Sequence, residues 1–332
     1  MNSIGRIFRL TIFGESHGPS VGIIIDGCPP GLPLSIVDFN ADIEKRKGGL
    51  QKGTTPRAEA DTPIILSGSF NERTTGSPLT IIFENNNTRS DDYKERRNIP
   101  RPGHADFVAS KKFGGFEDYR GGGHFSGRLT VCLVAAGVIA KKILSECSGR
   151  VSCTASIVEA GGETDVEAAI QKAIDGQDSI GGIIECIVDG LPIGLGEPFF
   201  DSAESLISHA VFAIPAIKGI EFGAGFKAAN MKGSEHNDAL ENESGKTITN
   251  NAGGIVGGLT NGNPLVFRVV IKPTSSTPKE QQSLNIESGS VENFTVKGRH
   301  DLCIALRVPV VLEAVTACVM ADLFLMQNLY DR

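Results

Sequence analysis

Histidines lie in short glycine-rich segments of this chain, beside charged or hydroxyl side chains. Four of the six histidines are in such segments: His17, His104, His124 and His300. Imidazole is the usual acid–base group near neutral pH, and it is also a common metal ligand. No two histidines have the H-x-x-x-H spacing of a helical zinc site, so the sequence favours acid–base chemistry over a metal centre.

Arginines and lysines gather near the same segments. A guanidinium holds a carboxylate or phosphate with two parallel hydrogen bonds, so such a group is typical of a site for an anionic ligand. A scattered, solvated basic surface is the alternative that the sequence alone leaves open. The residues concerned are Arg46, Lys52, Arg57, Arg101, Arg120, Arg128 and Arg299.

The segment Arg120–Arg128, RGGGHFSGR, runs directly into a predicted helix. Glycines let backbone N–H groups approach an anion, and a helix N-terminus adds partial positive charge. The segment therefore has the physical character of a phosphate cradle, although an ordinary loop before a helix would look the same. It matches neither the Walker A pattern nor the dinucleotide-binding G-x-G-x-x-G pattern.

The composition limits the class of protein. The chain has 332 residues, of which 40 are glycine, where the usual frequency predicts roughly 23. The surplus has no Gly-X-Y period, which excludes collagen. A net charge of −7 argues against nucleic acid as the main partner. We find no run of 18 apolar residues free of charge and no signal peptide. Seven cysteines without Cys-x-x-Cys predict reduced thiols in the cytoplasm.

Hydrophobic periodicity predicts the elements that carry these residues. A capping pattern of Thr164 and Glu167 marks the start of one helix. Several strands are adjacent along the chain, which favours an α+β fold with antiparallel sheets and a single domain over 1–332. The polar stretch 85–103 is long for a loop, and 85–98 is our candidate for a mobile cover. Expected strands are 6–13, 20–26, 62–67, 79–84, 181–189 and 265–271; expected helices are 35–46, 127–145, 164–174, 201–212 and 309–329.

Six motifs, taken together and in this order, resemble the chorismate synthase family over nearly the whole chain. They are Gly14-Glu-Ser-His-Gly18, Thr54-Thr-Pro-Arg57 with Glu59 and Asp61, Arg101-Pro-Gly-His-Ala-Asp106, Arg120-Gly-Gly-Gly123, Lys272-Pro-Thr-Ser-Ser276 and Gly298-Arg-His-Asp301.

The resemblance implies a lyase that eliminates phosphate and a proton from 5-enolpyruvylshikimate 3-phosphate in an anti 1,4 sense, giving chorismate in the shikimate pathway of aromatic amino acid biosynthesis. It implies reduced FMN, without net redox change, which lends electron density to the substrate and helps remove the proton at N5. It also implies a β-α-β sandwich with helices between two antiparallel sheets, and a cytoplasmic homotetramer. We see no added reductase segment, so NADPH (the NADP link of the family) would act only as an indirect reductant.

The resemblance assigns roles residue by residue. His17 would protonate the leaving phosphate, His104 would hold the anionic reduced flavin, and Asp301 would assist the proton relay. Substrate anions would be held by Arg46, Lys52, Arg101, Ser126, Arg128 and Arg299. The flavin would contact His124, Phe125, Ser126, Ala216, Gly257, Lys272, Pro273, Thr274, Ser275, Ser276 and Arg299.

The chain departs from the family pattern at three places, one of which is Arg46-Lys47-Gly48-Gly49, where Arg-Arg-Pro-Gly is usual. His124-Phe125 replaces the usual Arg-Ser after the triple glycine, and Lys52 replaces an arginine. Lysine keeps the charge but loses the bidentate geometry.

Two other functions remain open at this point. A metal-dependent hydrolase of a phosphorylated metabolite would use His17, His104 and Asp301 as ligands. A non-catalytic scaffold would use the glycine loops only for assembly.

Overall fold

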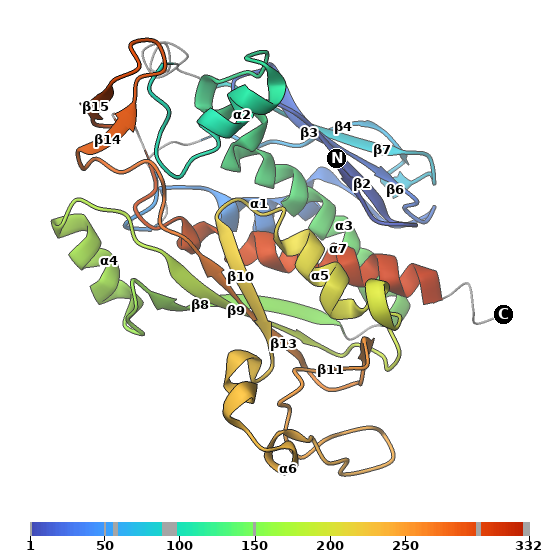
Figure 1. Cartoon of the computed structure of the whole chain (residues 1–332). Coiled ribbons are helices and arrows are strands. Elements are labelled where there is room, and N and C mark those ends of the chain that lie inside the picture. The colour runs from blue at the N-terminus through green and yellow to red at the C-terminus, as the bar shows by residue number, and fades with distance from the viewer. Residues whose placement is uncertain are drawn as a thin grey trace.

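The computed structural model describes residues 2–49, 51–55, 59–87, 98–148, 151–296 and 300–327. Helices and strands alternate irregularly along it, as Figure 1 shows. The helices are α1 (Asn40–Arg46), α2 (Asp106–Phe113), α3 (Thr130–Ser148), α4 (Val166–Asp175), α5 (Ala203–Val211), α6 (Gly233–His236) and α7 (Pro309–Gln327).

The first sheet is antiparallel, with the strand order β1-β2-β3-β7-β4. Its central strand buries Val21, Ile23 and Ile25 completely, which is the period-two pattern of a sheet with one face on the core. The predicted strands 20–26 and 79–84 have the predicted bounds. The strands are β1 (Ser3–Ile4), β2 (Arg9–Gly14), β3 (Ser20–Asp26), β4 (Ile64–Ser67) and β7 (Leu79–Glu84).

The second sheet is also antiparallel, with the order β10-β13-β9-β8. On β13, Leu265, Phe267, Val269 and Ile271 are buried, while Arg268 on the opposite face pairs with the carboxylate of Glu185 across the ladder at 2.8 Å. One face therefore packs on the core and the other meets solvent. The strands are β8 (Ser152–Ala160), β9 (Gly182–Asp189), β10 (Ile217–Phe222) and β13 (Leu265–Ile271).

Smaller two-stranded ribbons lie outside the two sheets. They are β5 (Ser69–Phe70) with β6 (Arg73–Thr74), β11 (Ile255–Val256) with β12 (Leu259–Thr260), and β14 (Gln281–Leu284) with β15 (Val291–Phe294). Short 3-10 helices include η1 (Ile36–Phe39), η4 (Arg120–Phe125), η5 (Gly127–Leu129), η6 (Phe199–Asp201), η7 (Gly225–Asn230) and η8 (Ile304–Arg307).

Helices α3 and α7 pack against each other between the two sheets (Figure 1). Helix α3 lies on β3 and β7, whereas α7 lies on β8 and β9. Every residue of α7 from Val310 to Leu323 is buried, so this helix is apolar on almost all sides. The predicted β-α-β sandwich is therefore confirmed in its layers.

Helix α7 is long and apolar enough to cross a membrane by length and composition, the only such helix among the described residues. In this fold, however, 78% of its most apolar stretch is buried inside the protein. It is thus placed as a core helix, as its position between the sheets also indicates.

The sequence-based boundaries need some corrections. Asp165, not Thr164, caps α4, because its carboxylate accepts a hydrogen bond from the Ala168 backbone N–H at 3.0 Å. Strands β8 and β10 and helix α2 were not predicted. Polar and small residues interrupt the apolar alternation of β8, whose sequence is SCTASIVEA, and this hides its period.

Candidate active site

A cavity of about 900 Å³ opens between the helical layer and the loops around it. Its walls come from segments far apart in sequence: the N-terminal residues, the end of α1, the loop before α3, the loop before β10, the loop after β13, and the turn before α7. Its size is that of a site for a cofactor or substrate.

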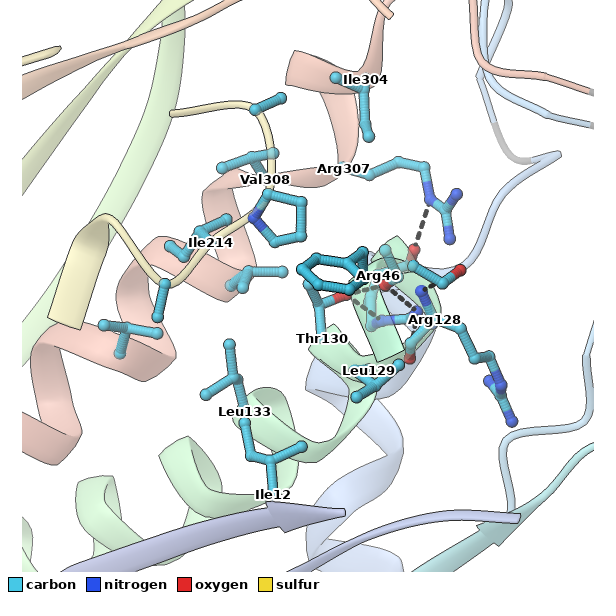
Figure 2. A pocket seen from close by; sticks show the side chains of 18 of the residues that line it. Ile12, Arg46, Arg128, Leu129, Thr130, Leu133, Ile214, Ile304, Arg307 and Val308 are labelled. Atoms are coloured by element: carbon cyan, nitrogen blue, oxygen red, sulfur yellow. Dashed lines mark hydrogen bonds between the residues drawn. The ribbon is translucent and has the colours of Figure 1, made fainter. Parts of the chain in front are cut away.

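The cavity has a cationic side and an apolar side. Figure 2 shows Arg46, Arg128 and Arg307 together on one side, opposite an apolar wall. Such a division suits a ligand with both a flat apolar part and anionic groups. The apolar wall includes Ile12, Leu133, Ile214 and Val308.

Arg46 and Arg128 both bind the carboxylate of Asp61. The Arg46 Nη1 donates to Oδ2 at 3.1 Å, and the Arg128 Nη1 donates to Oδ1. The three side chains are at most 4% exposed. Two guanidiniums thus share one buried carboxylate, which leaves one net positive charge in the cavity wall.

The other donors of these arginines are also used within the protein. The Arg46 Nε donates to Thr130 Oγ1 at 2.9 Å, and its Nη2 to the carbonyls of Gly127 and Arg128. The Arg128 Nε donates to Asn85 Oδ1 at 2.9 Å. Burial, with the neighbouring charge of Arg307, lowers the pKa of Arg46 to about 9, which still leaves it charged at neutral pH.

Asp301 also lines the cavity and lies just before η8. Its Oδ1 accepts a hydrogen bond from the Thr55 backbone N–H at 2.8 Å, and its Oδ2 accepts one from Arg307 Nη1 at 3.1 Å. The Arg307 Nε in turn donates to the carbonyl of Arg46 at 2.9 Å. Arg307 therefore connects Asp301 to the Arg46 cluster.

His104 and Arg101 form a second charged group around Asp106, at the start of α2. The Arg101 guanidinium donates to both carboxylate oxygens at 2.8 Å, and His104 Nδ1 lies 2.5 Å from Oδ1. Burial opposes the charge of Asp106, but these partners outweigh it and hold the pKa of the carboxyl well below its usual range. Asp106 thus fixes the orientation of the His104 ring.

The triple glycine separates His17 from His104. Gly121, Gly122 and Gly123 all have positive φ, between 53° and 82°. A Cβ on Gly121 would lie 2.2 Å from His17 Cε1, and one on Gly122 would lie 3.2 Å from His104 Cε1. Only glycine therefore allows the loop to pass between the two imidazoles. His17 is buried behind this loop and does not itself line the cavity.

The loop after β13 lines the cavity with Lys272, Pro273, Thr274, Ser275 and Ser276. Lys272 Nζ and Ser275 Oγ both donate to the Gly103 carbonyl, at 2.9 and 2.8 Å. Among the described residues, Thr274 Oγ1 is buried without a hydrogen-bond partner. Such an atom fits a ligand better than a closed protein interior.

His124, Phe125, Ser126 and Ala216 also line the cavity. The His124 Nδ1 lies 2.8 Å from the Gly14 carbonyl, and its Nε2 lies 3.3 Å from Asn2 Oδ1. The histidine that departs from the family pattern is thus held on the N-terminal side of the cavity.

Four predicted site residues stay outside this set, and His17, behind the triple-glycine loop, is one of them. Lys52 does not line the cavity, and Gly257 lies in the turn between β11 and β12, also away from the described lining. Arg299, together with Arg57 and most of the expected cover at 88–97, lies outside the described residues. Within the described part of the chain, no group of three or more His, Cys, Asp or Glu side chains is arranged to hold a metal ion.

Two charged residues that hold the predicted site together, Arg307 and Asp61, were given no role of their own from the sequence. Arg307 had no glycine or histidine beside it, and Asp61 was noted only as part of a motif. The signal that could have found Asp61 is the excess of arginines, because buried guanidiniums need a carboxylate partner.

Comparison with known proteins agrees with this geometry. The family model described as chorismate synthase matches residues 8–325. A protein named chorismate synthase from Chitinophaga pinensis is 68% identical over 332 residues, covering 100% of this chain and 99% of that one. Another of that name from Dehalococcoides mccartyi is 42% identical over 360 residues, covering 100% of this chain and 98% of its own.

A solved structure is also similar. It is titled "Crystal Structure of Chorismate Synthase", has a TM-score of 0.74 at 26% identity, and the alignment covers 98% of this chain and 93% of that chain. The likeness thus extends over both sheets and the helices between them.

Proposed function

The chain belongs to the chorismate synthase family, and we propose that its cavity binds 5-enolpyruvylshikimate 3-phosphate together with reduced FMN. The activity of the family, elimination of phosphate to give chorismate, is that of this chain. The division of the cavity into a cationic and an apolar side is the observation that carries the proposal. The substrate has carboxylates and a phosphate, and the flavin has a phosphate and a flat ring that is anionic when reduced.

The residues of the cavity fit a flavin. Apolar side chains such as Ile214 and Val308 offer a surface for a flat ring, and the loop from Lys272 to Ser276 offers an ammonium and hydroxyls. The buried, unpartnered hydroxyl of Thr274 supports a ligand there. We propose that this loop, with Phe125, Ser126 and Ala216, holds FMN. When bound, reduced FMN supplies electron density to the elimination and a basic ring nitrogen.

The substrate's anionic groups are assigned to the cationic side. The positive charge of Arg46, Arg101 and Arg128 would hold its carboxylates and phosphate, with the hydroxyl of Ser126 as a further hydrogen-bond donor. Lys52 and Arg299 remain predicted members of this set. His124 and Gly257 remain predicted flavin contacts.

Proton transfer is assigned to three side chains. His17, kept in place by the Gly121 contact, would protonate the leaving phosphate. His104, oriented by Asp106 Oδ1 at 2.5 Å, would face the flavin and hold its reduced, anionic form. Asp301, held by Arg307, would assist the proton relay.

The test is an anaerobic assay of the purified chain. We expect chorismate to form from 5-enolpyruvylshikimate 3-phosphate only when FMN is present and reduced by dithionite. The control is the same mixture with oxidised FMN, which should give no product. Turnover without flavin, or none with reduced flavin, would contradict the proposal. Activity abolished by a chelator would instead favour the metal-dependent hydrolase.

We also propose a homotetramer in the cytoplasm, with NADPH only as an indirect reductant of FMN. The resemblance supports all three proposals, and the free thiols of the six described cysteines, of which five are buried, support the cytoplasmic location alone. Sedimentation velocity of the purified chain, at micromolar concentration, would measure the assembly state. A species of one chain under these conditions would contradict the tetramer.

A further inference from the structure

Asp61 is the carboxylate around which the cationic side of the cavity is built. It accepts hydrogen bonds from Arg46 on one oxygen and Arg128 on the other, and its side chain is 1% exposed. No role was assigned to it beyond its place in a motif. We propose that Asp61 is a positioning residue that holds the Arg46 and Arg128 guanidiniums in the geometry that binds the substrate's anionic groups; this rests on the proposed function.

Asp61 balances the charges of the two arginines. Two guanidiniums in a buried wall repel each other, and burial disfavours their charges. A single carboxylate between them removes the repulsion and leaves one net positive charge. The wall therefore stays attractive to an anion and still tolerates two arginines side by side.

Asp61 also sets the geometry of the two arginines. The partners of Arg46 and Arg128 are not interchangeable, because each guanidinium uses a different oxygen of Asp61. The remaining partners, Thr130 for Arg46 and Asn85 for Arg128, come from different elements. Asp61 is the one side chain, among the described residues, that both arginines share. Arg46 Nη2 also donates to the backbone carbonyl of Arg128 at 3.2 Å, but Asp61 is the side chain that joins the two guanidiniums to each other.

The backbone of Asp61 has a φ of 51°. This is the left-handed region, which aspartate tolerates better than most residues but which still carries strain. The strain is accepted where the surrounding contacts over-determine the conformation. Here the two arginines do so.

The test uses Asp61→Asn, which keeps the shape but loses the charge. Its amide can accept from one arginine only, so the other guanidinium is displaced. We expect calorimetric affinity for 5-enolpyruvylshikimate 3-phosphate, in the presence of oxidised FMN, to fall by roughly 10-fold or more. FMN affinity should stay within about a factor of two of wild type.

A matched control is Glu313→Gln. Glu313 is buried like Asp61 and pairs with Lys141 at 3.0 Å, but it does not line the cavity. This variant should lower stability while leaving both affinities unchanged. If Asp61→Asn does not fold, Asp61→Glu replaces it, because the carboxylate moves by one bond and displaces both guanidiniums. The same loss of substrate affinity is expected.

Four outcomes decide the matter. Loss of substrate affinity alone supports the positioning role. If Asp61→Asn or Asp61→Glu binds the substrate as tightly as the wild type does, the positioning role is overturned. The proposed function still stands in that case, provided that the wild-type chain turns over the substrate. Equal losses of substrate and FMN affinity identify a merely structural residue and overturn the role. Absence of substrate binding by the wild type overturns the proposed function and the role together.

Discussion

At the residue scale, glycine is required where two predicted catalytic side chains approach the same loop. Gly121 and Gly122 lie against His17 and His104, and their φ angles are 59° and 82°. The surplus of glycine seen in the composition therefore has a local cause: neither a Cβ nor a right-handed backbone fits between the imidazoles.

This makes a prediction for Gly121→Ala. The new Cβ would displace His17, and the left-handed backbone would cost about 1 to 2 kcal/mol of stability. We expect the rate of chorismate formation to fall by roughly 10-fold or more, as for loss of a general acid. Steady-state kinetics with reduced FMN measures it.

The control is Gly162→Ala. Gly162 has φ of 85° and no atom within 4 Å of its would-be Cβ, so it carries the backbone strain without a displaced neighbour. Gly162→Ala should lose as much stability as the left-handed backbone alone costs Gly121→Ala. Its rate of chorismate formation should be that of the wild type. Equal rates in both variants would contradict the assigned role of the Gly121 contact.

At the scale of elements, the N-terminal strand region is held by one carboxylate of α7. Asp322 accepts hydrogen bonds from the backbone N–H groups of Arg6, Ile7 and Phe8, each at 2.8 Å. The sequence of these three residues has no apolar alternation that would hold them on the core. The buried carboxylate of Asp322 therefore holds this segment in place. The N-terminal wall of the cavity is thus joined to the central helix.

The pairing of α3 and α7 depends on a small residue. A Cβ on Gly137 would lie 2.3 Å from the Cβ of Ala314 and 2.4 Å from its Cα. Gly137→Ala should therefore separate the helices and cost about 1 to 3 kcal/mol, despite the better helix propensity of alanine. Urea unfolding at 25 °C measures the free energy of unfolding.

Gly233→Ala is its control, because no atom lies within 4 Å of that position in α6. We expect this exposed substitution to be neutral or slightly stabilising. A Gly137→Ala variant as stable as Gly233→Ala would show that the helices adjust their distance freely.

At the scale of the whole molecule, one core joins the two sheets. Buried residues of both sheets and of α3 and α7 belong to the same hydrophobic cluster. We propose that the chain is one domain, and that unfolding exposes Cys28 beside the first sheet and Cys186 in the second sheet together. Both thiols are buried and free, and burial raises the pKa of Cys28 to about 11.

The measurement is thiol labelling across a urea series at one protein concentration, with the labelled peptides quantified by mass spectrometry. Coincident midpoints for Cys28 and Cys186 are expected. Half-buried Cys153, on β8, serves as an early-labelling reference. Separate midpoints would mean that the sheets unfold as two units.

The sequence by itself determined the family, the α+β class, most helices, most strands of the two large sheets, and the loops that carry His104, Ser126 and Lys272. Those features are local: they follow from short motifs, apolar periods and turn residues. It also indicated an anion site, because arginines and lysines lie near the glycine-rich segments of the sequence.

Only the tertiary structure decided which of these residues meet. It brought Asp61 between Arg46 and Arg128, which lie 15 and 67 residues away along the chain. It also brought Arg307 against Asp301, at the edge of a turn that no apolar period marks. It left Lys52 and Gly257 away from the cavity. Partners of a buried charge are chosen by packing in three dimensions, and a one-dimensional pattern records the charge without its partner.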